Sequence, residues 1–237
     1  MTPLSQLLYN PHLQAPLGSA GNKGLITPLE SALTKNSPAS RLESALTKTP
    51  GEGLLSLTRQ PTNGVRSRRF ALKANQQITH IQRLRACEST LKRFLEVASV
   101  LNHGDHLGPI LIQLPPTFKF DRPLLEDFLA LRPPAFAFAF EVRHASWYTE
   151  ETYAVLRQHE TALCLSETEK QTPPDVLTTG FTYARLRLEN YTPKQLAAWR
   201  KRFDPWLAQG VDVYAYCKHE DAGKAPAYAR QLLGKAN

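Results

Sequence analysis

An α/β fold built on parallel strands is what this sequence predicts, and three observations support it. From Phe70 onward, strand-like and helix-like segments alternate six times, which is the pattern of parallel strands joined by helical crossovers. One strand, residues 136–142, has a bulky apolar face and a face that begins with small residues. Charged residues gather at the carboxyl ends of the strands, where parallel barrels build their sites. These features favour a TIM-barrel-like (β/α) fold.

The strand at residues 136–142 is the clearest element. Phe136, Phe138 and Phe140 fall on one face, whereas Ala137 and Ala139 fall on the other, because side chains alternate along a strand. In a barrel, the phenylalanines would pack outward under helices and the alanines would fill the crowded interior. The polar face ends in a carboxylate and a guanidinium. A buried strand with a purely structural Glu–Arg pair explains the same pattern.

The remaining elements follow in order. Apolar runs and alternation predict strands at residues 70–74, 109–114, 161–166, 181–187 and 211–216. Helical spacing of apolar residues predicts helices at 89–101, after Asp121, at 149–159, after Thr192 and at 226–233. Thr192, Pro193 and Gln195 form a capping-box start. A doubly wound sheet also fits this alternation, but no dinucleotide-binding glycine motif and no P-loop follows a strand.

Residues 1–66 differ from the rest of the chain. They are rich in Ser, Thr, Pro, Gly and Leu, and the heptapeptide Leu29 to Lys35 recurs unchanged at Leu42 to Lys48. The repeat is too short for a solenoid. We therefore divide the chain into an irregular, low-complexity segment at 1–66 and a barrel domain at 67–237. Gly53 to Leu57 is the one nearby candidate for an additional strand.

Charge and cysteine content narrow the functional classes. The formal net charge is +8 and the isoelectric point is about 9.5, which favours anionic partners. The three cysteines are far apart and form no CxxC pair, so they predict reduced thiols in a cytoplasmic protein. Neither a membrane span nor a signal peptide is recognisable. The sequence indicates no metal site and identifies no cofactor.

Candidate site residues come from the strand ends. The candidates for ligand binding at the mouth are Lys73, Gln113, Arg143, Trp147 and Arg185. Several cations around one carboxylate suit an anion, because arginine forks match phosphate or carboxylate. Glu141 is the candidate base, and His144, directly after the central strand, is a second acid–base candidate. Mutual ion pairing that caps the barrel core is the alternative explanation of these charges.

Six stretches of the chain form a recognisable combination. They are Phe70-Ala-Leu-Lys-Ala-Asn75, Ile78-Thr-His80, Gln113-Leu-Pro-Pro116, Phe140 to Trp147, Tyr183-Ala-Arg185 and Val213 to Tyr216. Together they resemble the domain of unknown function 72 (YecE-like) family. The resemblance implies a TIM-barrel-like fold and a bacterial protein, but no established reaction. The family's first two strands are not recognisable here. We therefore expect an N-terminally atypical or truncated member with an incomplete barrel, open at the strands that contain Lys73 and Tyr214.

Three functions remain open at this stage. The first is binding of, or action on, a phosphorylated or other anionic small molecule at the mouth. The second is nucleic-acid binding or processing, which would use the positive charge. The third is an incomplete barrel without activity. Open strand edges also invite pairing with another chain, so oligomer formation is a further expectation.

Overall fold

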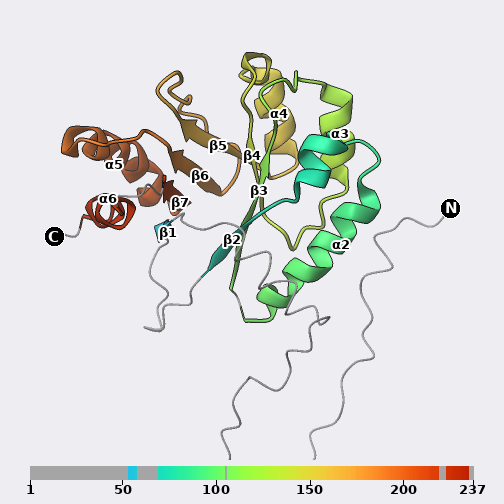
Figure 1. Ribbon diagram of the computed structural model, residues 1–237, viewed down its shortest axis with the longest axis horizontal. Coiled ribbons are helices and arrows are strands. Elements are labelled where there is room, and N and C mark those ends of the chain that lie inside the picture. Colours follow the sequence, from blue (N-terminus) through green and yellow to red (C-terminus); the bar gives the residue numbers. More distant parts are fainter. Residues whose placement is uncertain (1–52, 58–68, 105, 219–222, 235–237) are drawn as a thin grey trace, which may run out of the picture.

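The sheet is the centre of the fold. The computed structural model describes residues 53–57, 69–104, 106–218 and 223–234, with the backbone alone at 53–57, 103 and 104. Within these ranges seven strands form one sheet in the order β1-β7-β6-β5-β4-β3-β2 (Figure 1). They are β1 Gly53–Leu57, β2 Phe70–Lys73, β3 Leu107–Gln113, β4 Phe138–Glu141, β5 Ala162–Glu167, β6 Phe181–Leu186 and β7 Asp212–Cys217.

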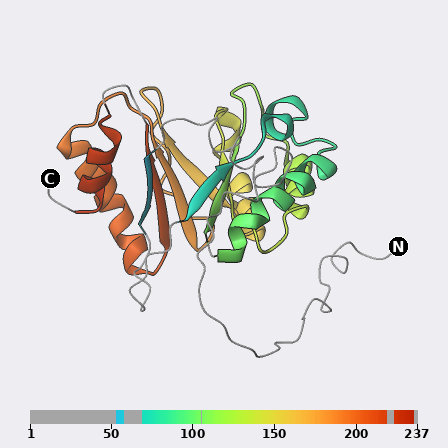
Figure 2. The same cartoon turned by 60° about the horizontal axis from the view of Figure 1, so that its bottom comes forward.

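Strands β2 to β7 are parallel and follow one another in chain order. They curve into half of a barrel, with the helices on the outer side (Figure 2). This confirms the expected α/β fold and its incomplete, TIM-barrel-like character. Sequential parallel strands are reached through helical crossovers, which is why the six-fold alternation in the sequence was informative.

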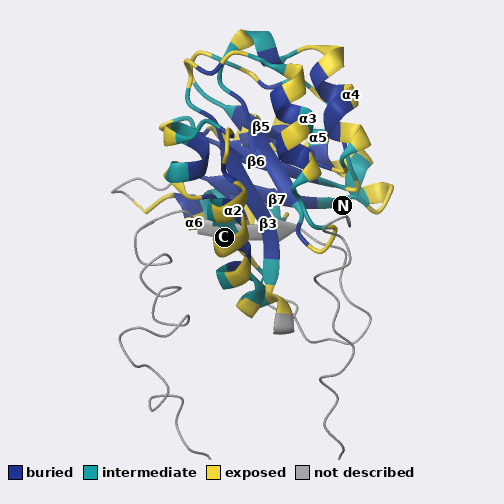
Figure 3. Ribbon diagram, turned by 90° about the vertical axis from the view of Figure 1, so that its right-hand side faces the viewer, coloured by how far each residue is buried: buried dark blue, intermediate teal, exposed yellow. Residues whose placement is uncertain are grey.

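The helices cover the outer face of the sheet in two groups. They are α2 Glu88–Ala98, α3 Arg122–Ala130, α4 Glu150–Gln158, α5 Pro193–Ala208 and α6 Ala225–Leu232. Helices α2, α3 and α4 bury their apolar sides against β3 and β4 in one core, and α5 and α6 bury theirs against β6 and β7 in a second. Figure 3 shows buried strands behind helices whose outer surfaces are exposed.

Three predicted helix starts are confirmed by capping hydrogen bonds. The Asp121 carboxylate accepts from the backbone N–H of Leu124 at the start of α3. Thr149 caps α4, and Thr192 forms the expected capping box at the start of α5. Each bond satisfies a backbone donor that the first helical turn leaves unpaired.

The shorter turns occupy the loops between strands and helices. They are the π-helix η3 Gln77–Ile81 and the 3-10 helices η4 Ser99–Gly104 and η5 Ala145–Trp147. The helix predicted at 89–101 is therefore shorter than expected, since α2 ends at Ala98 and η4 continues the chain. A spacing of three residues fits both helix types, so Leu101 could not distinguish them.

The concave face of the sheet carries the small and aromatic residues of the interior. Its buried members are Leu111, Ala139, Ala162, Cys164, Tyr183, Tyr214 and Tyr216. The rings of Tyr183 and Tyr216 stack with their centroids 4.8 Å apart. Phe138 and Phe140 lie on the other side, in the core beneath the helices. The predicted division of β4 into an outer phenylalanine face and an inner alanine face is thus confirmed.

Strand β1 changes one expectation about the edges. It pairs antiparallel with β7, from Gly53 beside Cys217 to Leu57 beside Val213. The candidate strand at 53–57 is confirmed, and the expectation that the strand containing Tyr214 is an open edge is wrong, because β1 covers that edge. At the other end of the sheet, β2 pairs with β3 alone among the described residues.

The rest of the N-terminal segment, including both copies of the heptapeptide, lies outside the described residues, so the division at residue 66 stays a prediction. Among the helices of the described ranges, none has both the length and the apolar character needed to cross a membrane. Cys87, Cys164 and Cys217 are buried free thiols.

Candidate functional site

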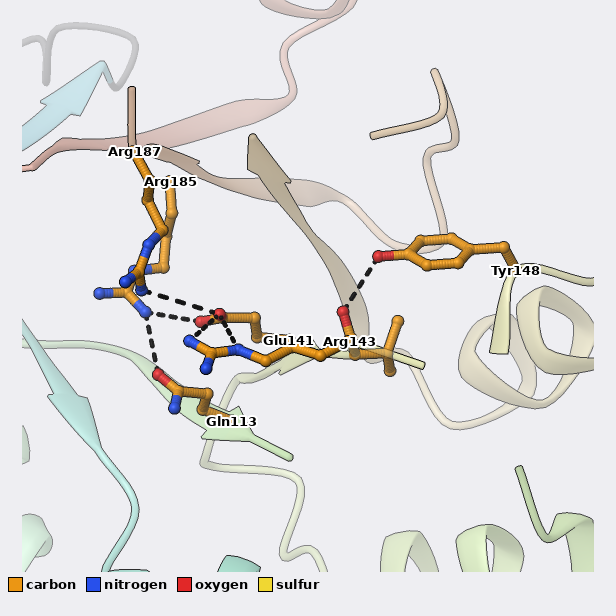
Figure 4. A network of polar contacts seen from close by, with 7 residues as sticks. Gln113, Glu141, Arg143, Tyr148, Arg185 and Arg187 are labelled. Carbon is orange, nitrogen blue, oxygen red and sulfur yellow. Dashed lines mark hydrogen bonds and ion pairs between the residues drawn. The ribbon is translucent and has the colours of Figure 1, made fainter. Parts of the chain in front are cut away.

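The carboxyl ends of the parallel strands bring one set of polar side chains together. Gln113 ends β3 and pairs in register with Glu141, which ends β4. Arg185 comes from the end of β6, whereas Arg143 and Arg187 follow β4 and β6 by two residues and one residue. Figure 4 shows the side chains converging on Glu141. We call Glu141, Arg143, Arg185 and Arg187 the arginine cluster.

Glu141 is the centre of the arginine cluster. Its side chain is 0% exposed, and both carboxylate oxygens accept hydrogen bonds. Arg143 donates to Oε1 through Nε at 3.0 Å and through Nη2 at 2.9 Å. Arg185 donates from Nη1 to Oε2 at 2.6 Å. Nη1 of Arg187 lies 3.9 Å from Oε1.

Gln113 extends this network to β3. Its amide oxygen accepts a hydrogen bond from Nη1 of Arg185 at 3.0 Å. Gln113 and Arg185 are both buried, so the hydrogen bonds between them and Glu141 form away from water. A buried polar network holds its members in one arrangement when its hydrogen bonds are satisfied. The position of Arg185 is therefore set by two strands other than its own.

The arginine cluster carries more positive than negative charge. Within it, three guanidinium groups face one carboxylate. Burial alone would raise the pKa of Glu141, but Arg185 and Arg143 more than offset it, so that pKa lies below its ordinary value. Arg185 is 8% exposed, whereas Arg143 and Arg187 are 32% and 31% exposed. The two outer guanidinium groups are thus within reach of solvent and of a ligand.

Lys73 lies at the same end of the sheet. It ends β2 and pairs in register with Leu111, one inward-facing position before Gln113. Burial lowers the pKa of His80, and the positive charges of Lys73 and Arg143 lower it further. Of the predicted site residues, the structure therefore brings Gln113, Glu141, Arg143 and Arg185 into direct contact and places Lys73 on the same face nearby.

His144 has a local role in the loop after β4. Its Nδ1 accepts from the backbone N–H of Ser146 at 3.1 Å and lies 2.9 Å from the Ser146 hydroxyl. That hydroxyl in turn accepts from the backbone of Phe120. Within the described ranges, no hydrogen bond or ion pair joins His144 to the arginine cluster. Its predicted acid–base role stays a prediction.

Trp147 lies in the core and is 1% exposed. Its Nε1 donates to the Phe118 carbonyl at 2.7 Å, and its ring packs against Phe118 and Phe120. The short helix η5 turns the side chain toward the outer core rather than toward the arginine cluster. Its predicted ligand-binding role is untested, but these contacts identify a packing role.

Two residues of this end of the sheet were not among the predicted site residues. Arg187 is a member of the arginine cluster, and only its position just beyond a strand end pointed to it. His80 lies on η3, the π-helix that follows β2, and no periodicity marks such a turn. Burial and the charges of Lys73, Arg143 and Arg83 lower the pKa of His80. No group of three or more side chains of metal-ligating type was found among the described residues.

Fold and site together define a (β/α) half-barrel protein with an arginine-rich cluster at its mouth. The family model described as protein of unknown function DUF72 matches residues 65–237, and the chain belongs to this family. This confirms the resemblance identified from the sequence, and it gives no reaction.

Solved structures of the family support the fold. A DUF72 family protein from Thermotoga maritima is 21% identical, with a TM-score of 0.59, and the match covers 86% of this chain and 81% of that chain. A DUF72 family protein from Enterococcus faecalis is 16% identical, with a TM-score of 0.59 over 70% of this chain and 77% of that chain. At these identities the likeness concerns the fold alone. No curated protein matched the chain.

Proposed function

We propose that the mouth of the half-barrel binds a phosphorylated or otherwise anionic small molecule through the arginine cluster. The observation that carries the proposal is the convergence of three guanidinium groups on Glu141, of which those of Arg143 and Arg187 are about a third exposed. Guanidinium groups bind phosphate and carboxylate through paired hydrogen bonds. An anion at this position would place negative charge and hydrogen-bond acceptors beside the guanidinium groups of Arg143 and Arg187.

Glu141 serves this site by orienting the arginines. Both of its oxygens already accept hydrogen bonds from guanidinium groups, and its pKa is lowered. A carboxylate in this state is a weak proton acceptor, because accepting a proton would weaken its three charge-assisted hydrogen bonds. These contacts favour a positioning role over the role of general base.

The test uses Arg187→Gln. Arg187 is the member of the cluster farthest from Glu141, so its replacement disturbs the buried network least. We expect calorimetry with inorganic phosphate and with a small phosphate monoester to give binding to the wild type. The variant should bind at least about tenfold more weakly, since a hydrogen bond to a charged group contributes about 1.5–3 kcal/mol.

Arg93→Gln is the matched control, because Arg93 is exposed on α2. Equal affinity of the wild type and the Arg187 variant, or an equal loss in the control, would contradict the proposal. Binding of a single-stranded oligonucleotide that weakens steeply with salt would instead support the nucleic-acid hypothesis.

A further inference from the structure

His80 is held in a fixed position close to where β2 ends. Helix η3 begins four residues after Lys73, and the Asn75 carboxamide accepts from the backbone of Gln77 at 2.8 Å. The buried hydroxyl of Thr79 lies 2.8 Å from Nδ1 of His80. The other ring nitrogen, Nε2, has no hydrogen-bond partner among the described residues. One nitrogen thus holds the ring, and the second remains for a ligand.

The chain that follows His80 has an uncommon conformation. Arg83, Leu84 and Ala86 have φ angles of 50°, 65° and 44°, a region that side chains other than glycine rarely adopt. Arg83 is held there by its guanidinium over the Phe118 ring, 4.7 Å from the centroid. Strained backbone and π-helical turns are both found more often at functional sites.

Positively charged side chains from three elements lower the pKa of His80. They are Lys73 from β2, Arg143 from the segment after β4, and Arg83 from the loop after η3. Burial and these charges keep the pKa of His80 below its ordinary value, which favours the neutral ring in the absence of a ligand. A bound dianion would instead raise the pKa of His80, because its negative charge stabilises the protonated imidazolium.

We propose that His80 is a further ligand-binding residue of the site at the mouth, and that it takes up a proton from solvent when a tetrahedral dianion binds beside it. The inference rests on the proposed function and narrows the ligand class to phosphate-like dianions. The proton adds to a ring nitrogen, no bond of the ligand breaks, and the imidazolium N–H donates to the anion.

The proposal has a defined dependence on pH. A ligand that favours the protonated ring raises the pKa of His80 in the complex above that of the free protein. Affinity is therefore highest below the lower of these two values and falls as pH rises through the interval between them. Over this interval the affinity changes by about tenfold for each unit of difference between the pKa in the complex and the pKa in the free protein.

The experiment titrates sulfate into the full chain from about pH 5 to about pH 8, the range in which histidine changes charge. Sulfate is a dianion that does not titrate in this range, so any uptake of protons comes from the protein. Ionic strength is held constant with chloride. Calorimetry in buffers of different ionisation enthalpy then measures the protons bound with each sulfate.

We expect the wild type to bind sulfate more tightly at low pH and to take up protons on binding. His80→Gln should bind sulfate with one affinity across the range and without this uptake. His159→Gln is the control, because His159 follows α4 at the opposite end of the strands, and it should behave as the wild type does. His80→Asn, which keeps an acceptor near the position of Nδ1, repeats the test if the glutamine variant does not fold.

The outcomes separate the two proposals. If sulfate binds to the wild type without proton uptake, or if His80→Gln keeps the uptake, the role of His80 is refuted and the arginine site stands. If sulfate binds at no pH, and phosphate does not bind either, both proposals fail. A histidine ring signal in contact with Thr79 whose titration shifts upward with sulfate would support the proposal without any variant.

Discussion

Replacing Glu141 by glutamine tests the centre of the site most directly. The substitution keeps the shape of the side chain and removes its charge. One oxygen can still accept from Arg185 or from Arg143, but the new amide N–H₂ group faces guanidinium donors. Arg185, which is 8% exposed, loses the carboxylate that balances its charge. We therefore expect Glu141→Gln to be destabilising as well as to weaken anion binding.

The magnitude follows from the burial of the ion pair. Removing one partner of a buried pair costs about 3–5 kcal/mol, because the other charge remains without compensation. For a domain of this size each kcal/mol lowers Tm by about 2–4 °C. Thermal melts followed by circular dichroism should accordingly show a decrease of roughly 6–20 °C at neutral pH.

The pH dependence gives an independent check on the same residue. The pKa of Glu141 in the folded protein lies below its ordinary value of 4.5. Its contribution to stability is therefore complete above that ordinary value and is lost as pH falls through the folded-state pKa. The difference in Tm between wild type and Glu141→Gln should shrink as the solution becomes more acidic.

Glu167→Gln is the matched control on the neighbouring strand. Oε2 of Glu167 accepts from the Tyr191 hydroxyl at 2.6 Å and from Nε1 of Trp199 at 2.8 Å. Both donors are neutral, and a glutamine oxygen can accept from both, so the loss should be only about 1 kcal/mol. If Glu141→Gln melts within about 2 °C of the wild type, or if the two variants lose equal stability, Glu141 does not hold the cluster together.

Two further substitutions test the surroundings of the site. Trp147→Phe removes the hydrogen-bond donor to the Phe118 carbonyl. The free energy of unfolding, measured in urea, should fall by about 1–3 kcal/mol, and the affinity for phosphate should not change. Weaker phosphate binding at unchanged stability would instead show that Trp147 contacts the ligand. Asp121→Ala removes the N-cap of α3 and should lower the free energy of unfolding by about 1 kcal/mol in the same assay. A decrease below about 0.3 kcal/mol would show that Pro123 and packing suffice to start the helix.

Much of the fold followed from periodicity. Strict alternation in β4 placed Phe138 and Phe140 outside and Ala139 inside, and start signals at Asp121, Thr149 and Thr192 located three helices. The pairing of β1 did not follow, since five residues with strand character contain no information about the direction or the neighbour of the strand. The partner of such a short strand depends on which sheet edge is open, and here that edge is β7.

The candidate site was predictable where it depends on strand ends. Gln113, Glu141 and Arg185 come together because parallel strands finish at one end of a barrel. Trp147 was placed less well, since side-chain alternation stops where β4 stops and η5 reverses the chain. The position of His80 depends on a π-helix, for which the sequence provides no periodic signal.

The arginine cluster lies in the middle of the sheet rather than at its edges. The cluster and Gln113 come from β3, β4 and β6, or from residues just after them, and each of these strands has a neighbour on both sides. Hydrogen bonds among these residues cross the concave face without using either edge strand. These contacts therefore do not depend on either edge of the half-barrel.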